Sequence, residues 1–199
     1  MASFPDTEKK LKNKISSYRS SLKKDNKNFG SINDGSGKRY LLFYYHFVLD
    51  DLNKSRDYFE WYKKEFPDDV GEPIQKLCWA LSLHRLANHD EAQQMLAELM
   101  LSNLCLIPNI IGHDIEEYGI WHASNFEYID YPEYIPVEVR ENIRESELEW
   151  METLYYSFEF RRIRDRYIEI YRQLQYTKEI EKRKCLLDES YSLLDIFHQ

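Results

Sequence analysis

The sequence predicts an all-α protein built from stacked antiparallel helical hairpins with an additional C-terminal helical layer. Only 6 glycines and 6 prolines are spread over 199 residues, and long charged amphipathic stretches dominate the chain. Hydrophobic residues make up 43% and aromatic residues 15%, which argues against an intrinsically disordered chain. A chain of this length can bury a substantial core without a metal ion or a disulfide.

Residues 1–37 predict a basic N-terminal helix followed by a flexible connector. The helix is expected over Pro5–Lys24, with lysines outside and one apolar side formed by Leu11, Ile15, Tyr18 and Leu22. The connector, Asp25–Lys38, is rich in turn-forming residues. Its Asn33–Gly37 stretch contains one carboxylate and is not followed by Gly-Lys-Ser/Thr, so it matches neither a calcium loop nor a phosphate loop.

The most regular stretch of the chain, Pro73–Leu104, predicts two antiparallel helices separated by a turn at Ala87–Asp90. Apolar residues recur at helical spacing on both sides of this turn: Leu77, Trp79, Ala80, Leu83 and Leu86 before it, and Ala92, Met95, Leu96, Leu99 and Met100 after it. Asp90 is expected to cap the second helix, because its carboxylate can accept the first amide hydrogens and suits the positive end of the helix dipole.

This helix pair resembles a tetratricopeptide (TPR) repeat, which has small residues where two helices touch and bulky residues where they fill gaps. The small positions are held by Ala80 and Ala92, and the bulky ones by Trp79, Leu83 and Leu96. Two positions depart from the family pattern, since Ala87 stands in place of glycine and Leu104 in place of proline.

A second, less regular copy lies upstream. Leu42, Ser55 and Phe59 correspond to Trp79, Ala92 and Leu96, and Pro67 stands at the terminal proline of the family. Ser55 and Ala92 are 37 residues apart, compared with about 34 in the family. Phe43 and Tyr62 replace small residues and are expected to open this pair more widely. The resemblance therefore covers residues 38–104 and implies a degenerate repeat pair over residues 38–107.

The resemblance implies a concave groove that binds another protein. By the family pattern, its predicted partner-binding residues are Tyr40, Tyr44, Phe47, Leu77, Leu81, His84 and Arg85. Such an aromatic and apolar groove suits an extended or helical peptide. The alternative is that the N-terminal or C-terminal helices of the chain already fill it. The lysine and asparagine with which chaperone-binding members hold a C-terminal carboxylate are missing, so a co-chaperone role is not expected.

Residues 108–199 predict an irregular aromatic and acidic segment followed by C-terminal helices that pack on the repeats, so that the whole chain forms one compact domain. Six aromatic residues lie among acids between Tyr118 and Tyr134, namely Tyr118, Trp121, Phe126, Tyr128, Tyr131 and Tyr134. This segment either wraps over the repeat core or forms an acidic, aromatic lip that recognises a basic protein. Helices are expected over Asn109–Glu117, Pro136–Asn142, Glu145–Ser157 and Phe158–Gln175. A final helix, capped by Thr177, is expected to bury Ile180, Leu187, Tyr191 and Leu194.

The charge of the chain is unevenly distributed around a net value of −8. Residues 1–40 contain ten Lys and Arg against four acids, whereas residues 113–150 contain eleven acids against two arginines. The expected partner is a protein or peptide, and the acidic middle of the chain would suit a basic one. The basic N-terminal end could instead contact an anionic partner. The alternative for both regions is an ordinary solvated helix face. Nucleic acid is not expected, because the acidic middle of the chain would repel a phosphate backbone.

The sequence gives little indication of catalysis, and we expect no enzyme activity, no cofactor and no metal site. The three cysteines form no C-x-x-C pair, and no glycine-rich nucleotide loop or nucleophile elbow occurs. One alternative is a phosphohydrolase of the HD type, in which the adjacent His113 and Asp114 hold a divalent metal that activates water. The further ligands would come from His84, Asp165, Glu117 and His122.

The sequence thus predicts a non-enzymatic protein-binding module. A regulator or a neutralising, immunity-type protein that masks a basic partner would fit this design. No apolar stretch is long enough to cross a bilayer, so we expect no membrane association and a cytoplasmic location. Self-association into a homo-oligomer is a further alternative, in which a neighbouring subunit fills the groove.

Overall fold

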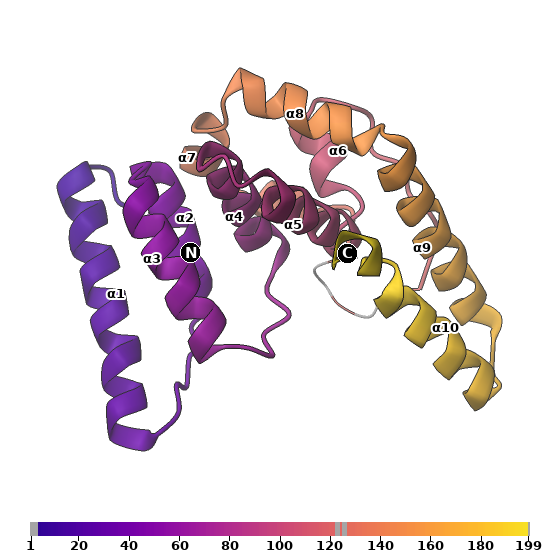
Figure 1. Cartoon of the computed structure of the whole chain (residues 1–199), viewed down its shortest axis with the longest axis horizontal. Coiled ribbons are helices and arrows are strands. Elements are labelled where there is room, and N and C mark those ends of the chain that lie inside the picture. Colours follow the sequence, from indigo (N-terminus) through magenta and orange to yellow (C-terminus); the bar gives the residue numbers. More distant parts are fainter. Residues whose placement is uncertain (1–3, 122–123, 125–126, 199) are drawn as a thin grey trace.

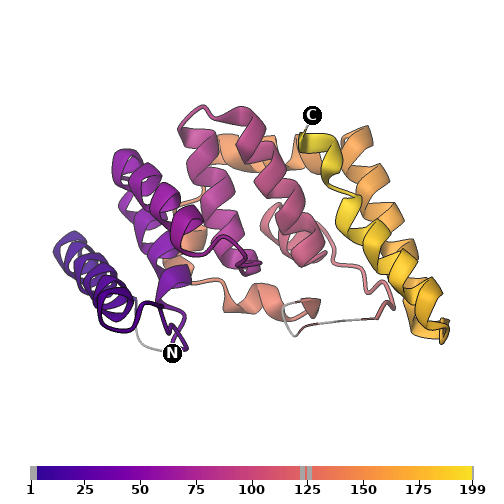
Figure 2. The same cartoon turned by 60° about the horizontal axis from the view of Figure 1, so that its bottom comes forward.

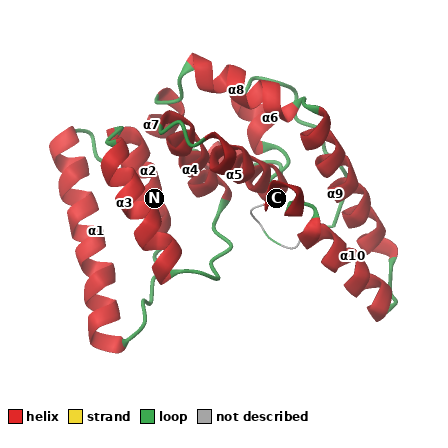
Figure 3. Cartoon of the chain, viewed as in Figure 1, coloured by secondary structure: helices red, strands yellow, loops and turns green. Residues whose placement is uncertain are grey.

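The structure is a computed structural model that describes residues 4–121, 124 and 127–198 of the chain. The described residues form ten α-helices and two short 3-10 helices, with no strand among them (Figure 3). The predicted all-α class is therefore confirmed. Phe126 and His122, which entered the predictions above, lie outside the described residues.

The helices of the first half follow one another as hairpins, and the last two long helices form another (Figure 1). Those of the first half are α1 (Glu8–Phe29), α2 (Lys38–Leu49), α3 (Leu52–Glu65), α4 (Pro73–Arg85) and α5 (His89–Ser102). Those of the second half are α6 (Leu106–Ile110), η2 (Tyr131–Tyr134), α7 (Val137–Glu141), α8 (Glu145–Tyr155), α9 (Phe158–Tyr176), α10 (Ile180–Ser192) and η3 (Asp195–His198). In Figure 1, α1, α2 and α3 lie side by side at one end of the molecule, and α9 and α10 lie at the other.

The centre of the molecule is the α4–α5 hairpin, which packs on α2 on one side and on α9 on the other. Ala80 and Ala92, the two predicted small contact residues, are both fully buried in this hairpin. Small side chains let helix backbones approach closely, which explains the tight α4–α5 pairing. On the far side of α2, the amphipathic helix α1 buries Leu11, Ile15 and Leu22.

A cluster of aromatic rings joins the first hairpin to α4. The ring of Phe43 on α2 lies 5.0 Å from that of Trp79 on α4, and 5.2 Å and 4.9 Å from those of Phe59 and Tyr62 on α3. Tyr58, which is fully buried, also packs edge-on against Phe43. Aromatic contacts therefore fill this junction, at positions where a regular repeat has small residues.

Local residues explain where the central helices begin and end. Pro73 opens α4, and Glu72 forms a capping box with Gln75. Ala87, at the position where the family has glycine, adopts a left-handed backbone with φ of 56°. The predicted cap of α5 is corrected: Asn88 is the N-cap residue and makes no side-chain capping bond, while Asp90 lies in the first turn of the helix.

Three predictions for the second half are wrong in detail. The helix predicted over Asn109–Glu117 is replaced by the earlier, shorter α6, after which the chain is irregular. Thr177 does not open the last helix; it ends α9, where its hydroxyl donates to the carbonyl oxygen of Gln173 at 2.8 Å. On α10, Ile180 and Tyr191 are exposed, and Leu186 and Ser190 are buried instead.

Between α6 and α7 the chain crosses the molecule in two described limbs. The outbound limb comprises residues 112–121 and the return limb residues 127–136, which include η2. Figure 2 shows both limbs along the lower side of the molecule. Tyr131 and Pro132 of the return limb are buried, as is Ile120 of the outbound limb. The predicted wrapping over the core is therefore found at these residues, whereas Trp121, Tyr128 and Tyr134 remain exposed.

Candidate functional site

The inner groove, defined by the seven predicted partner-binding residues, is largely buried. Tyr44, Phe47, Leu77 and Leu81 have exposed fractions of 8%, 1%, 0% and 0%. The other three residues, Tyr40, His84 and Arg85, are only partly exposed. α2 and α4 do bring these residues together, but their side chains are covered by later parts of the same chain.

A buried carboxylate fastens the return limb over one end of the inner groove. Glu72 accepts hydrogen bonds from the hydroxyls of Tyr44 on α2 and Tyr131 on the return limb. It also accepts the backbone amides of Ile74 at 3.2 Å and Gln75 at 2.7 Å. Burial raises the pKa of Glu72, while these hydrogen bonds act in the opposite direction. Three segments far apart in sequence thus meet at one carboxylate.

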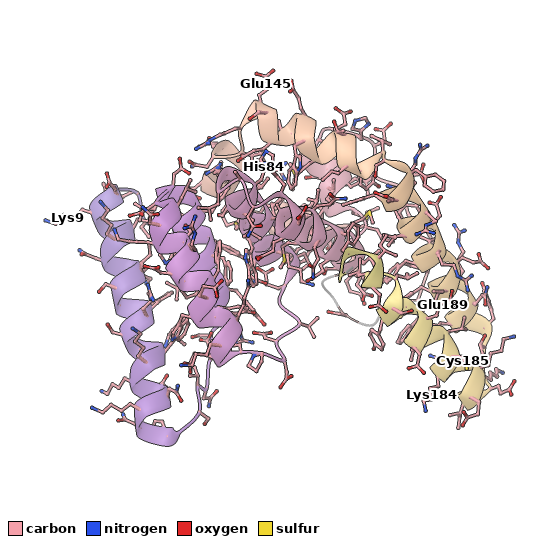
Figure 4. The ribbon with its side chains drawn as sticks, viewed as in Figure 1. Lys9, His84, Glu145, Lys184, Cys185 and Glu189 are labelled. Atoms are coloured by element: carbon pink, nitrogen blue, oxygen red, sulfur yellow. The ribbon has the colours of Figure 1, made fainter. Side chains whose placement is uncertain are left out.

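Ion pairs and ring stacking close the other end of the inner groove. The guanidinium of Arg85 donates to Glu147 on α8 at 2.6 Å, to Asp50 at 2.8 Å and to the carbonyl oxygen of Asn142 at 2.7 Å. His84, which Figure 4 shows on the side of α4 facing α8, stacks on Trp150 with ring centroids 4.3 Å apart.

Tyr40, also a residue of the inner groove, already has hydrogen-bond partners within the fold. Its hydroxyl donates to Asp69 at 2.6 Å and accepts from Arg39 at 2.8 Å. The expectation of an open inner groove is therefore corrected, and the stated alternative, a groove filled by the chain itself, describes this structure. A role of these seven residues in partner binding stays a prediction, because it would require the return limb and α8 to move away.

A different cavity of about 400 Å³ lies between the two limbs and the α5–α6 junction. We call it the acidic pocket. Its apolar and aromatic lining consists of Leu104, Cys105, Tyr118, Ile120, Tyr128 and Ile129. Its charged lining consists only of acids, namely Glu116, Glu117, Glu127 and Asp130.

Three of the four acids of this pocket have no ion-pair partner in the part of the chain that the structure describes. Glu116, Glu117 and Asp130 are exposed, and none of them makes an ion pair with another residue that the structure describes. Their charge also reaches the pocket floor: burial raises the pKa of the Cys105 thiol to about 11, and the charge of Glu117 adds to this shift. The pocket combines an apolar floor with a negative rim, an arrangement that suits a long cationic side chain.

Exposed apolar side chains continue from the pocket along the return limb into α7. Tyr128, Ile129, Tyr134 and Val137 are 47%, 45%, 51% and 58% exposed. Asp130 and Glu133 lie between them in the sequence, and Glu138 follows Val137. Of the eleven acids in residues 113–150, only Glu147 is buried. Two alternatives were predicted for this segment, a cover over the core and an acidic, aromatic surface. The segment has both buried residues and a mixed acidic and apolar surface.

The His113–Asp114 pair lies beside α8. The two ring nitrogens of His113 face Glu152 at 2.9 Å and the hydroxyl of Tyr156 at 3.2 Å. Asp114 is exposed. No group of three or more residues of metal-binding type gathers anywhere in the described part of the chain, so the structure does not bring His113 and Asp114 together with His84 or Asp165.

The sequence showed only part of the acidic pocket. The predicted acidic and aromatic segment, Tyr118–Tyr134, includes Glu127 and Asp130 of the rim but not Glu116 and Glu117. Leu104 and Cys105, at the α5–α6 junction, gave no such signal because they follow α5 as an ordinary apolar run. Sequence periodicity alone could not show that the two limbs would fold back over this run.

The fold and the pocket together define an all-α protein of stacked helices with an acidic surface cavity. Neither a protein-family model, nor a curated protein, nor a solved structure matched this chain. None of the helices in the described residues is both long enough and apolar enough to cross a membrane.

Proposed function

We propose that this protein is a TPR-like, non-enzymatic module that binds a basic protein through the acidic pocket and the exposed side chains beside it. The observation that carries the proposal is the pocket itself, in which Glu116, Glu117 and Asp130 stand without ion-pair partners around an apolar floor. Exposed carboxylates that lie close together and have no cation beside them create a negative potential, which attracts a ligand of opposite charge.

A lysine or arginine of the partner is the occupant that the pocket fits best. Its aliphatic stem would lie on Leu104 and Ile120, and its charged end would reach the carboxylates at the rim. Desolvated charge-assisted hydrogen bonds of this kind contribute most to specificity, whereas the surrounding negative charge increases the rate of association. The net charge of −8 should also increase the rate at which a basic partner associates.

Apolar contacts would add to this recognition. Tyr134 and Val137 are 51% and 58% exposed on η2 and α7. Buried aromatic and aliphatic anchors usually supply most of the affinity of a protein interface, with charged residues around them. The partner surface should therefore combine basic and apolar residues.

The proposal includes a regulatory or neutralising role, in which this compact protein masks a basic surface of its partner in the cytoplasm. Self-association through the same surface is disfavoured, since two copies would bring acidic residues face to face. An isologous dimer would place the same patch against itself. The partner is accordingly a different protein.

The proposal is tested by capture from the cell of origin with purified wild-type protein and with the triple variant Glu116→Gln/Glu117→Gln/Asp130→Asn. The wild type should retain a basic protein whose binding weakens with salt, and the triple variant should retain it at least about tenfold less, the equivalent of about 1.4 kcal/mol.

A matched control changes the net charge by the same amount at another place. The variant Asp57→Asn/Glu60→Gln/Asp68→Asn also moves the charge from −8 to −5, because it removes three exposed acids from α3 and the loop after it. It should capture the partner as the wild type does. Equal capture by all three proteins would contradict the proposal.

A further inference from the structure

The N-terminal end of the molecule has a cavity whose charge is opposite to that of the acidic pocket. It has a volume of about 400 Å³ and lies between α1 and the first turn of α3, where α2 ends. We call it the basic groove. The charged residues that line it in the described part of the chain are all cations, namely Lys12, Arg19, Lys23 and Lys54. The uncharged lining consists of Ile15, Ser16, Ser20 and Leu49.

Helix α1 forms one continuous side of the basic groove. Lys12, Ser16, Arg19 and Lys23 follow one another at intervals of four, three and four positions, so they lie on one side of the helix. With a rise of 1.5 Å per residue, the row from Lys12 to Lys23 is about 16 Å long. Such a row is longer than a single phosphate or carboxylate group, and it matches about five residues of an extended chain.

Two of the four cations have no acidic partner. Arg19 and Lys23 form no ion pair with any residue that the structure describes. The guanidinium of the half-buried Arg19 instead lies over the ring of Tyr58, 5.7 Å from its centroid. A guanidinium stacked on a ring keeps the N–H donors at its edge available to an anion.

The other two cations have partners that a ligand can replace. Lys12 pairs with Glu8, and Lys54 pairs with Asp51 at 2.7 Å. Each pair joins residues three or four positions apart, and all four side chains are at least 31% exposed. Ion pairs of this exposed kind contribute little to stability.

The positive charge of the groove also acts on a buried residue of α2. Burial lowers the pKa of His46 to about 4, and the charges of Arg19 and Lys54 act in the same direction, whereas Asp51 opposes them. The potential on this side of α2 is therefore positive, although the chain as a whole has a net charge of −8.

We propose that the basic groove binds an extended acidic segment of another protein. Successive carboxylates of the segment would accept hydrogen bonds from Arg19 and Lys23, and the hydroxyl of Ser16 would donate another. The aliphatic parts of the same side chains would lie on Ile15 and Leu49.

A strand of nucleic acid fits this surface less well. Beyond Lys23 the groove continues into a second hollow, which is lined by Asn26, Lys27, Trp61 and Glu65. The carboxylate of Glu65 accepts a hydrogen bond from Asn26 at 2.6 Å, so an acid lies at this end. Trp61 is the one aromatic residue in the described lining of the two hollows, whereas single strands are usually held by several stacked bases.

This inference goes beyond the proposed function and does not depend on it. The basic groove and the acidic pocket share no residue, belong to different halves of the chain and select ligands of opposite charge. Each site can therefore fail without the other.

The experiment follows the fluorescence anisotropy of a labelled hexaglutamate peptide during titration with the full chain. Because the net charge is −8, general attraction to a polyanion is not expected, and binding would report a local site. The peptide should bind saturably at about 50 mM NaCl and more weakly at about 300 mM NaCl. Absence of saturable binding at the lower salt concentration overturns the proposal.

A pair of charge-matched variants locates the site. Arg19→Gln/Lys23→Gln should weaken binding of the peptide about tenfold. The control Lys9→Gln/Lys24→Gln also moves the net charge from −8 to −10, but it removes two exposed lysines of α1 that line neither hollow. Figure 4 shows Lys9 pointing away from α2 and α3. The control should bind as the wild type does, and equal binding by the two variants overturns the proposal.

Further measurements separate the proposal from a folding defect and from other ligands. Lys23→Gln alone leaves the contact of Arg19 with Tyr58 intact and should still weaken binding about threefold. A short single-stranded oligothymidylate should bind less tightly than the peptide, and tighter binding of the oligonucleotide overturns the proposal. The triple variant of the acidic pocket should bind the peptide as the wild type does, so that failure of one proposal can be told from failure of the other.

Discussion

The carboxylates at the inner groove and those at the acidic pocket differ in their surroundings. At the inner groove, Glu72 and Glu147 are 5% and 1% exposed, and both are held by several donors. At the acidic pocket, Glu116, Glu117 and Asp130 are exposed and have no ion-pair partners among the described residues.

The difference follows from the cost of burying charge. A carboxylate that leaves water must be compensated within the fold, whereas an exposed one is solvated and remains available to a ligand. The carboxylates of the inner groove therefore hold the structure together. We assign recognition of the partner to the carboxylates of the acidic pocket. This comparison predicts that substitutions at the inner groove affect stability, and that substitutions at the acidic pocket affect binding alone.

The largest effect is expected for Arg85→Ala. This change leaves Glu147 buried without its cation, which should lower the free energy of unfolding by about 3–5 kcal/mol. Urea denaturation followed by circular dichroism measures the change. Arg144→Ala is the control, because that arginine is half exposed where it pairs with Asp50 and should cost less than about 1 kcal/mol. Equal losses in the two variants would contradict the comparison.

His46 tests the cost of burying a charge at a third place. It is buried, and neither ring nitrogen has a hydrogen-bond partner among the described residues. Burial lowers its pKa to about 4, with Arg19 and Lys54 acting in the same direction and Asp51 against them. Between pH 6.5 and 4 this histidine binds a proton in the unfolded state but not in the folded state. The free energy of unfolding should therefore fall as the pH falls from 6.5 toward 4.

The expected loss over that interval is about 3 kcal/mol, from about 1.36 kcal/mol per pH unit. His46→Phe keeps the ring packing against Tyr58 and should flatten the dependence of the unfolding free energy on pH between 6.5 and 4. The exposed His89, replaced in the same way, is the control. An unchanged pH dependence in His46→Phe would show that another group is responsible.

A smaller loss is expected for Tyr131→Phe, which removes one hydrogen bond to the buried carboxylate of Glu72. Hydrogen bonds to charged groups contribute about 2 kcal/mol, so the midpoint of thermal unfolding should fall accordingly. Limited proteolysis should also cut the return limb faster, because its main anchor is weakened. Tyr134→Phe, at an exposed neighbour on the same 3-10 helix, should change neither measurement.

The smallest effect on stability is expected for the triple variant Glu116→Gln/Glu117→Gln/Asp130→Asn. Its unfolding free energy should stay within about 0.5 kcal/mol of the wild type per substitution, since exposed residues without partners contribute little to folding. The same variant should lose the basic partner. A large loss of stability would mean that these acids support the fold, and the contrast with Glu72 and Glu147 would then fail.

Much of the helical structure could be predicted from the sequence. The stripes of apolar residues in α4 and α5 repeat every three or four positions, and a helix is defined by hydrogen bonds over the same distance. Predictions were less accurate where signals were weak: Thr177 is a good capping residue for either helix end, and α10 has apolar residues on several sides.

The candidate site was predicted less well, because it depends on contacts between distant segments. Family resemblance placed Tyr44 and Leu81 on the face where a partner usually binds, but it could not show that Tyr131 would occupy that region. In the same way, the acids of residues 116–130 were visible in the sequence, whereas their position over Leu104 was not.

The sequence by itself determined that this chain is helical, where α4, α5, α8 and α9 lie, and that its middle is acidic. These properties depend on neighbouring residues and on composition. Only the tertiary structure decided which surfaces remain open. The bonds of Glu72 to Tyr44 and Tyr131 span 28 and 59 positions, and no local pattern specifies which distant side chains will satisfy a buried charge.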